Sequence, residues 1–211
     1  MEPAAKASPS PGSAVERAFA LTSVVPVGAF AVLHVADYAR VLFGEQEIGS
    51  REAPSALLLA AEVLLVWLPL ATHAVLGAAF WKRRGAEPGS DASARALLAV
   101  HRISGIAIAL FLLDHFVRFR LPILTGELVP SDSVQRLASE LSRTHAGFPW
   151  IAAGSLLGVI AVAFHFTYGL RRIARRSPEL AASRVYSRVS LGVGLVLLFA
   201  GLFTLLYLAA G

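Results

Sequence analysis

The chain has 211 residues, of which 56% are hydrophobic and 16% are charged, and its mean hydropathy is +0.65. A soluble domain of this size carries more charge, and the net charge of +5 does not indicate a nucleic-acid partner because the basic residues fall between apolar runs. The chain has no cysteine, which excludes an iron–sulfur cluster, a c-type haem attachment and a disulfide within it.

The first 17 residues, MEPAAKASPSPGSAVER, are rich in Pro, Ala and Ser and predict a disordered tail. They lack the short apolar core and small-residue cleavage site of a secretory signal. The apolar run after them contains His34, Asp37 and Arg40, which a discarded leader would not need. We therefore treat residues 18–211 as one membrane domain.

Five apolar runs follow the tail, and each is long enough for a transmembrane helix, which takes about 20 residues. The expected spans are residues 20–43, 55–81, 97–118, 147–170 and 188–209. The predicted fold class is therefore all-α, a transmembrane bundle of five helices.

The loop expected at about 119–146 contains SVQRLASELSR. Its apolar residues at 134, 137 and 141 recur at helical spacing and predict a short interfacial helix.

The distribution of basic residues predicts the orientation of the bundle. Of the 19 Lys and Arg residues, 13 fall on one side: in the tail, and in or beside the loops that join the second span to the third and the fourth span to the fifth. Cytoplasmic loops carry an excess of Lys and Arg. The N-terminus is therefore expected in the cytoplasm and the C-terminus outside.

Each of the first four spans contains a histidine within its membrane-embedded part: His34, His73, His115 and His165. With a rise of about 1.5 Å per residue, His34 and His115 lie toward the outer ends of their helices, and His73 and His165 lie nearer the cytoplasm. Two histidines at each of two levels are what two stacked bis-histidine haems require. Because both axial positions of each iron are then filled, such sites suit electron transfer rather than oxygen activation.

Glycines follow two of these histidines at the spacing of one helical turn. Gly77 lies four residues after His73, and Gly169 lies four residues after His165. A missing side chain there leaves room for a flat macrocycle, or equally for close helix packing. Pro69, one turn before His73, predicts a kink.

A single histidine inside a membrane often serves only as a hydrogen-bonding group between helices. Four in consecutive spans, paired by depth, favour haem over that alternative. The remaining two histidines, His101 and His145, are assigned to the membrane interface and to an outer loop, where a solvated histidine is expected.

Four segments carry these histidines in order, and together they resemble the cytochrome b558-type anchor subunit of succinate dehydrogenases and fumarate reductases, the di-haem, five-helix class. The resemblance covers roughly residues 17–205, and the fifth span matches only as an apolar helix. The segments are VVPVGAFAVLHV, AEVLLVWLPLATHAVLG, HRISGIAIALFLLDHFVRFR and GVIAVAFHFTYGL.

The resemblance implies that His73 and His165 hold a proximal haem b and that His34 and His115 hold a distal one. It implies a flavoprotein and an iron–sulfur protein as partner subunits, a quinone substrate, expected to be menaquinone, and a place among the lipids of a bacterial cytoplasmic membrane. The chain itself would carry no dicarboxylate chemistry.

Haem propionates need cations or hydroxyl donors. Arg17, Arg102 and Ser104 stand at the inner ends of the first and third spans, within expected reach of the proximal haem. For the two arginines, anchoring to the cytoplasmic interface is the alternative reading.

Three acidic residues lie in the outer halves of the spans, where an ionisable group is costly and usually functional. Asp37 with Arg40 and Asp114 with Arg118 have the spacing of local ion pairs. Glu62 has no basic partner at such spacing, and we expect it to handle protons at a quinone site.

Two other functions remain open. One is the cytochrome b of a different quinone-linked enzyme, such as a formate dehydrogenase or hydrogenase, which would share the haems and differ in its soluble partner. The other is a haem-free transporter or assembly protein that uses its histidines to join helices. Against the latter, no inverted repeat or pair of broken helices stands out in the sequence.

Overall fold

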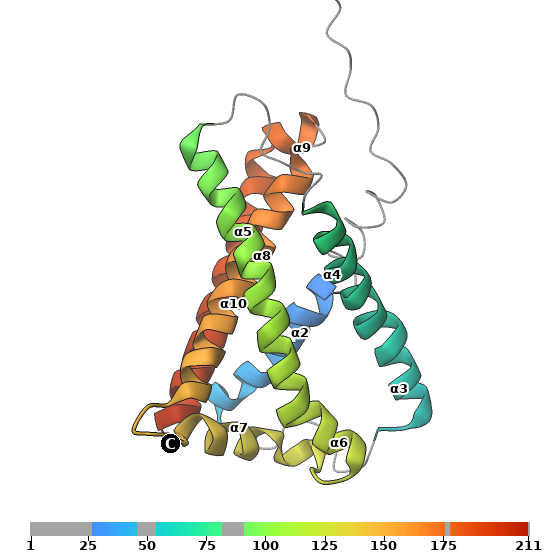
Figure 1. The fold of residues 1–211 in the computed structure, drawn as a ribbon, viewed down its shortest axis with the longest axis vertical. Coiled ribbons are helices and arrows are strands. Elements are labelled where there is room, and N and C mark those ends of the chain that lie inside the picture. The colour runs from blue at the N-terminus through green and yellow to red at the C-terminus, as the bar shows by residue number, and fades with distance from the viewer. Residues whose placement is uncertain (1–26, 46–53, 82–90, 176–177, 211) are drawn as a thin grey trace, which may run out of the picture.

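The computed structural model describes residues 27–45, 54–81, 91–175 and 178–210, and the regular elements in these ranges are all helices. The all-α class is confirmed. Four helical stretches are long and apolar enough to cross a membrane, as in a multi-pass membrane protein (Figure 1): Ala56–Phe80, Ala92–Thr125, Trp150–Ala174 and Arg184–Ala210.

The described part of the first expected span is helix α2 (Ala29–Tyr38), which continues as a 3₁₀ segment, Ala39–Phe43. It ends at Gly44, whose φ of 90° is in the left-handed region that glycine adopts without strain. Residues 20–26 and the expected tail lie outside the described residues. The count of five spanning helices therefore stays a prediction.

The second span is one continuous helix with an irregular middle: α3 (Ala56–Glu62), a π-helical segment (Val63–Trp67) and α4 (Leu68–Phe80). Pro69 has no N–H, so it removes one regular helical hydrogen bond and crowds the preceding turn. The wider π-helical turn directly before it is where the helix departs from regular α geometry.

The third span repeats this pattern, with α5 (Ala92–His115), a π-helical segment (Phe116–Arg120) and α6 (Leu121–Thr125). Pro122 again follows the π-helical segment, with only Leu121 between them. The expected end of this span at residue 118 is wrong, because the helix continues through the charged residues to Thr125.

The start of α5 is fixed by a side-chain cap. Asp91 accepts a 2.7 Å hydrogen bond from the backbone N–H of Ala94, which satisfies one free donor of the first turn. This hydrogen bond holds the pKa of Asp91 below its usual range. The helix therefore begins several residues before the expected start at 97.

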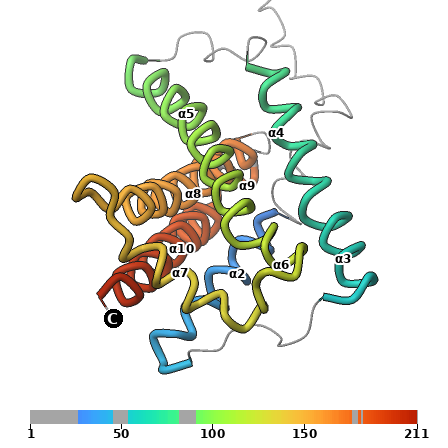
Figure 2. Tube along the Cα trace, turned by 60° about the horizontal axis from the view of Figure 1, so that its bottom comes forward, coloured from blue at the N-terminus to red at the C-terminus, as the bar shows by residue number. Residues whose placement is uncertain are grey.

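Helix α8 (Trp150–Ala174) packs against α5 on one side and α10 (Arg184–Ala210) on the other (Figures 1 and 2). Glycines permit the close approach of these helices. A Cβ at Gly158 would lie 2.5 Å from the Phe111 ring of α5, and a Cβ at Gly201 of α10 would lie 2.8 Å from Val159 of α8. The α3–α4 helix stands apart from this trio and has no fully buried residue.

The expected short helix is confirmed as α7 (Ser133–Ser142), which crosses one end of the bundle (Figure 1). It follows a 3₁₀ turn, Pro130–Asp132, and a further short helix, α9 (Pro178–Ala182), lies at the opposite end. The buried apolar cluster under α7 consists of Val134, Leu137 and Leu141 together with Val41, Phe119 and Leu208.

Candidate functional site

The structure brings the four span histidines together in two pairs. The ring centroids of His34 on α2 and His115 on α5 are 5.8 Å apart. Those of His73 on α4 and His165 on α8 are 6.2 Å apart. Each pair therefore joins two different helices, and the partners are those that depth along the helices had indicated.

The separation within each pair matches a shared metal atom. Two iron–nitrogen bonds of about 2.0 Å each, together with the distance from each nitrogen to its ring centre, place two axial imidazoles roughly 6 Å apart between centroids. The ring planes in the two pairs are inclined by 89° and 87°. Because imidazoles can rotate about a common axis, this angle is compatible with ligation of one iron.

His165 is held from one side by a single turn of α5. Its Nδ1 lies 3.0 Å from the backbone oxygen of His101 and 3.1 Å from the Oγ of Ser104. Ser104 is buried and donates its own hydrogen to the same carbonyl at 2.8 Å. A carbonyl acceptor at Nδ1 assigns the ring hydrogen to that nitrogen, so Nε2 keeps the lone pair that a metal needs.

Gly105 makes room for this arrangement. A Cβ at Gly105 would lie 3.1 Å from Cε1 of His165, which is tighter than ordinary packing. The helix α5 thus presents a carbonyl, a hydroxyl and a missing side chain to one imidazole. Spacing along one helix does not reveal the role of Gly105, because its contact is with a residue 60 positions later.

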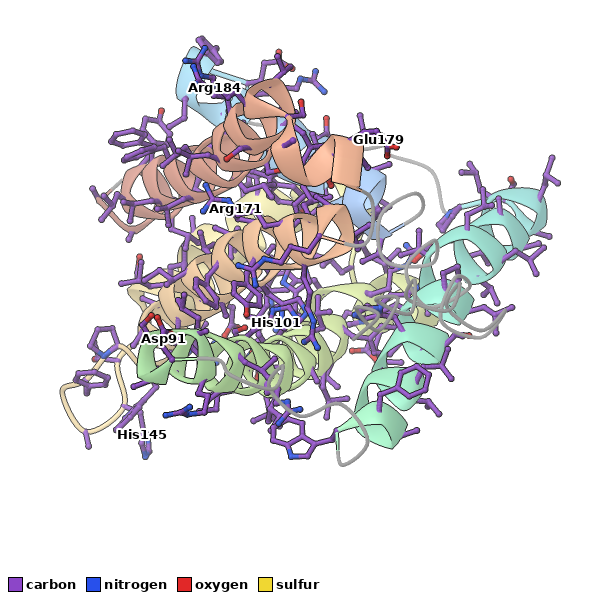
Figure 3. The ribbon with its side chains drawn as sticks, turned by 90° about the horizontal axis from the view of Figure 1, so that it is seen from above. Asp91, His101, His145, Arg171, Glu179 and Arg184 are labelled. Carbon is purple, nitrogen blue, oxygen red and sulfur yellow. The ribbon has the colours of Figure 1, made fainter. Side chains whose placement is uncertain are left out.

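The expectation of a solvated His101 is wrong. Its ring stacks on His165, with centroids 4.0 Å apart and planes inclined by 19°. The Tyr168 ring also contacts it, at a centroid distance of 4.9 Å. Its Nδ1 is buried and has no hydrogen-bond partner among the described residues. Because α5 begins at Ala92, His101 lies in its third turn, directed toward α8 (Figure 3). His145 is exposed in its loop, as expected.

Aromatic rings surround the other histidine pair. His34 lies between Phe30 and Tyr38, with centroid distances of 5.2 and 5.0 Å. His115 lies between Phe111 and Phe119, at 5.6 and 4.9 Å. These neighbours come from the turns before and after each histidine, so each imidazole has an aromatic ring on both sides along its own helix.

The four other residues expected to contact a cofactor differ in what the structure shows around them. The guanidinium of Arg102 lies 5.1 Å from the centroid of the Trp81 ring, a cation–π contact. A Cβ at Gly169 would lie 3.8 Å from Cε1 of His101. Gly77 lies within α4, and Arg17 lies outside the described residues. The cofactor roles of these four stay predictions.

Both expected local ion pairs are present. Asp37 and Arg40 are joined at 2.8 Å, and Asp114 and Arg118 are joined at 2.8 Å. Arg118 also reaches Glu140 of α7 at 3.3 Å. These contacts explain both acids without a further role.

Glu62 has a basic partner that its own helix does not supply. Its carboxylate forms an ion pair with Arg120 and accepts a 2.8 Å hydrogen bond from Nε1 of Trp67. The two π-helical segments meet at this point, because the rings of Trp67 and Phe116 are 5.0 Å apart. Spacing within one helix could not reveal this pair, since its members are separated by 58 residues.

Comparisons of the chain with protein-family models, with curated proteins and with solved structures give no match. The residues of the paired histidine sites and their contacts are therefore the basis for the function proposed next.

Proposed function

We propose that this chain is the di-haem cytochrome b membrane anchor of a succinate dehydrogenase or fumarate reductase, carrying electrons between a partner iron–sulfur subunit and membrane quinone. The observation that carries the proposal is the pairing of four histidines from four separate helices at the spacing of two axial ligand sets. Interhelical hydrogen bonding alone would not require two such pairs.

In this proposal, His73 and His165 hold the proximal haem, and His34 and His115 hold the distal haem. A haem b with two histidine ligands supplies one-electron transfer with no open coordination position. On the proximal side, the His101 carbonyl orients the imidazole of His165. On the distal side, the flanking aromatic rings restrict the orientation of both imidazoles and keep water from them.

The packing of the second span supports a large group between the helices. The stretch Ala56–Phe80 has no fully buried residue, although His73 and Trp67 from it reach rings on α8 and on the third span. Because only a few side chains of this helix contact the neighbouring helices within the described structure, its inward face has room for a flat apolar group. This arrangement is consistent with a haem seated against α4.

The choice of enzyme rests on the four histidine-bearing segments and their resemblance to succinate:quinone oxidoreductase anchors. Flavin and iron–sulfur chemistry would belong to partner subunits, because the chain has no cysteine for cluster ligation. Purification of the intact complex tests this choice: a co-purifying covalent flavin supports it, whereas a formate dehydrogenase or hydrogenase partner would show the alternative cytochrome b function.

A reduced-minus-oxidised spectrum of the purified chain, with haem quantified per polypeptide, tests the haem proposal. We expect close to two low-spin b-type haems in the wild type and about one in His73→Ala or in His34→Ala, because each substitution removes one axial ligand. His145→Ala, which changes an exposed loop histidine, is the matched control and should keep both. Absence of haem from membranes able to make it would leave the haem-free transporter.

A further inference from the structure

A cavity of about 200 Å³ lies on the flank of α8, at the end of the helix that carries its arginines. Its polar lining comes from Thr167, Arg171, Arg172 and Arg175. Its apolar wall is formed by Phe164 and Tyr168 of α8 and by Leu97 of α5. None of these residues is a proposed haem ligand, although the Tyr168 ring also contacts the His101 ring at a centroid distance of 4.9 Å.

The lining changes from apolar to basic along the helix axis. From Phe164 to Arg175 the helix rises about 16 Å, so the aromatic residues lie deeper in the expected membrane and the arginines lie at its edge. Leu97, on the other wall, is 44% exposed. A ligand that complements both the basic rim and the apolar wall has an anionic head and an apolar tail.

The cavity is separate from the proximal histidines around the circumference of α8. His165 faces α5, where it contacts Ser104 and the His101 carbonyl. At about 100° per residue, the residues facing the cavity are centred roughly 90° away from that direction, and Arg172 is the lining residue nearest to the His165 face. The cavity therefore opens beside the helix pair rather than between the histidine rings.

Two of the cavity's arginines, Arg171 and Arg175, have no acidic partner among the described residues. Both residues are exposed. The C-terminal end of a helix disfavours an anion, and the clustered guanidinium groups offset this effect. Figure 3 shows Arg171 on the side of α8 toward α10.

We propose that this cavity binds the phosphate headgroup of an anionic membrane phospholipid, with an acyl chain along Leu97, Phe164 and Tyr168. Guanidinium groups recognise phosphate by paired hydrogen bonds, and basic sites between helices at a membrane surface bind anionic lipid headgroups. Because a phospholipid also fills the apolar wall, it fits the cavity better than free inorganic phosphate. The inference does not rest on the proposed haem function.

Native mass spectrometry of the full chain, titrated with phosphatidylglycerol and with phosphatidylcholine, tests the site. We expect one tight phosphatidylglycerol per chain and a roughly thirtyfold loss of its affinity in the Arg171→Gln/Arg175→Gln double variant. The matched control is Arg184→Gln/Arg188→Gln, which removes two exposed charges from the start of α10 and should keep the tight site.

Three results would overturn the proposal. They are equal binding of the two lipids by the wild type, an equal loss of affinity in the two double variants, and displacement of the lipid by inorganic phosphate as readily as by phosphatidylglycerol. A change in haem content or potential in Arg171→Gln/Arg175→Gln, with lipid affinity unchanged, would assign these arginines to haem propionates and also overturn it. Failure of the haem proposal alone would leave the lipid result standing.

Discussion

At the scale of single residues, the imidazole of His165 is positioned by the two acceptors that face its Nδ1. The His101 carbonyl and the Ser104 hydroxyl lie at 3.0 and 3.1 Å from that nitrogen. Acceptors at the second nitrogen of a metal-bound histidine fix its tautomer and raise its basicity as a ligand. Ser104 is therefore better placed to tune this ligand than to contact a propionate directly.

If His165 ligates the proximal haem, Ser104→Ala should raise the midpoint potential of one haem and weaken retention of that haem about tenfold, because it removes one acceptor from the ligand. A redox titration with haem quantification measures both effects. The control is Ser190→Ala: this buried hydroxyl also donates to a backbone carbonyl, that of Tyr186, and forms no hydrogen bond to a histidine among the described residues. The same shift in both variants, or none in either, would contradict the positioning role.

Glu62→Gln should leave both haem signals intact and lower quinone turnover about a hundredfold if the carboxyl handles protons at the quinone site. The ion pair with Arg120 offers a competing structural explanation. Arg120→Gln separates the two explanations, since it breaks the same pair and keeps the carboxyl. Steady-state quinone kinetics of the two variants decide between them: equal losses would reject the proton role.

Sequence reasoning predicted ion pairs between residues of one helix and missed some contacts between residues of different helices. Asp37 with Arg40 and Asp114 with Arg118 are neighbours on one helix, so spacing alone predicted them. The stacking of His101 on His165 and the pairing of Glu62 with Arg120 depend on which helices meet and in which rotation. That information is not present in the spacing of a single span.

At the scale of elements, the same limit explains the misplaced end of the third span. The expected span ended at Arg118, before Arg120, because charged groups are costly in a membrane. The structure keeps both in the helix by supplying carboxylates from elsewhere: Asp114 and Glu140 for Arg118, and Glu62 for Arg120. The amphipathic helix α7 was predictable because its buried apolar residues recur at helical spacing within a segment of ten residues.

The contact of α5 with α8 depends on a glycine. Gly158→Ala should lower the free energy of unfolding by about 1–3 kcal/mol, because the added methyl group meets the Phe111 ring in packed surroundings. Unfolding in detergent measures the loss. Gly154→Ala is the matched control on the same helix, since a Cβ there has no neighbour within 4 Å among the described residues. Equal stability of the two variants would contradict this packing.

At the scale of the whole molecule, the two ends of the bundle are built differently. At one end, α7 packs over the apolar cluster and its buried Glu140 binds Arg118, Arg136 and Arg143. At the other end, α8 carries arginines that line an open cavity. A closed, charge-compensated end and an open basic end are consistent with the expected orientation, in which the basic end faces the cytoplasm.

The cysteine-free chain permits a direct test of that orientation. The third span, Ala92–Thr125, has 34 residues, about 51 Å of helix, which exceeds the roughly 30 Å hydrocarbon core, so its two ends reach water. A membrane-impermeant maleimide should label Glu127→Cys in intact cells and Ser93→Cys only after permeabilisation, because both positions are exposed and lie beyond or near opposite ends of the span. The reverse pattern would invert the topology, and labelling of both from one side would show that this helix does not cross the membrane.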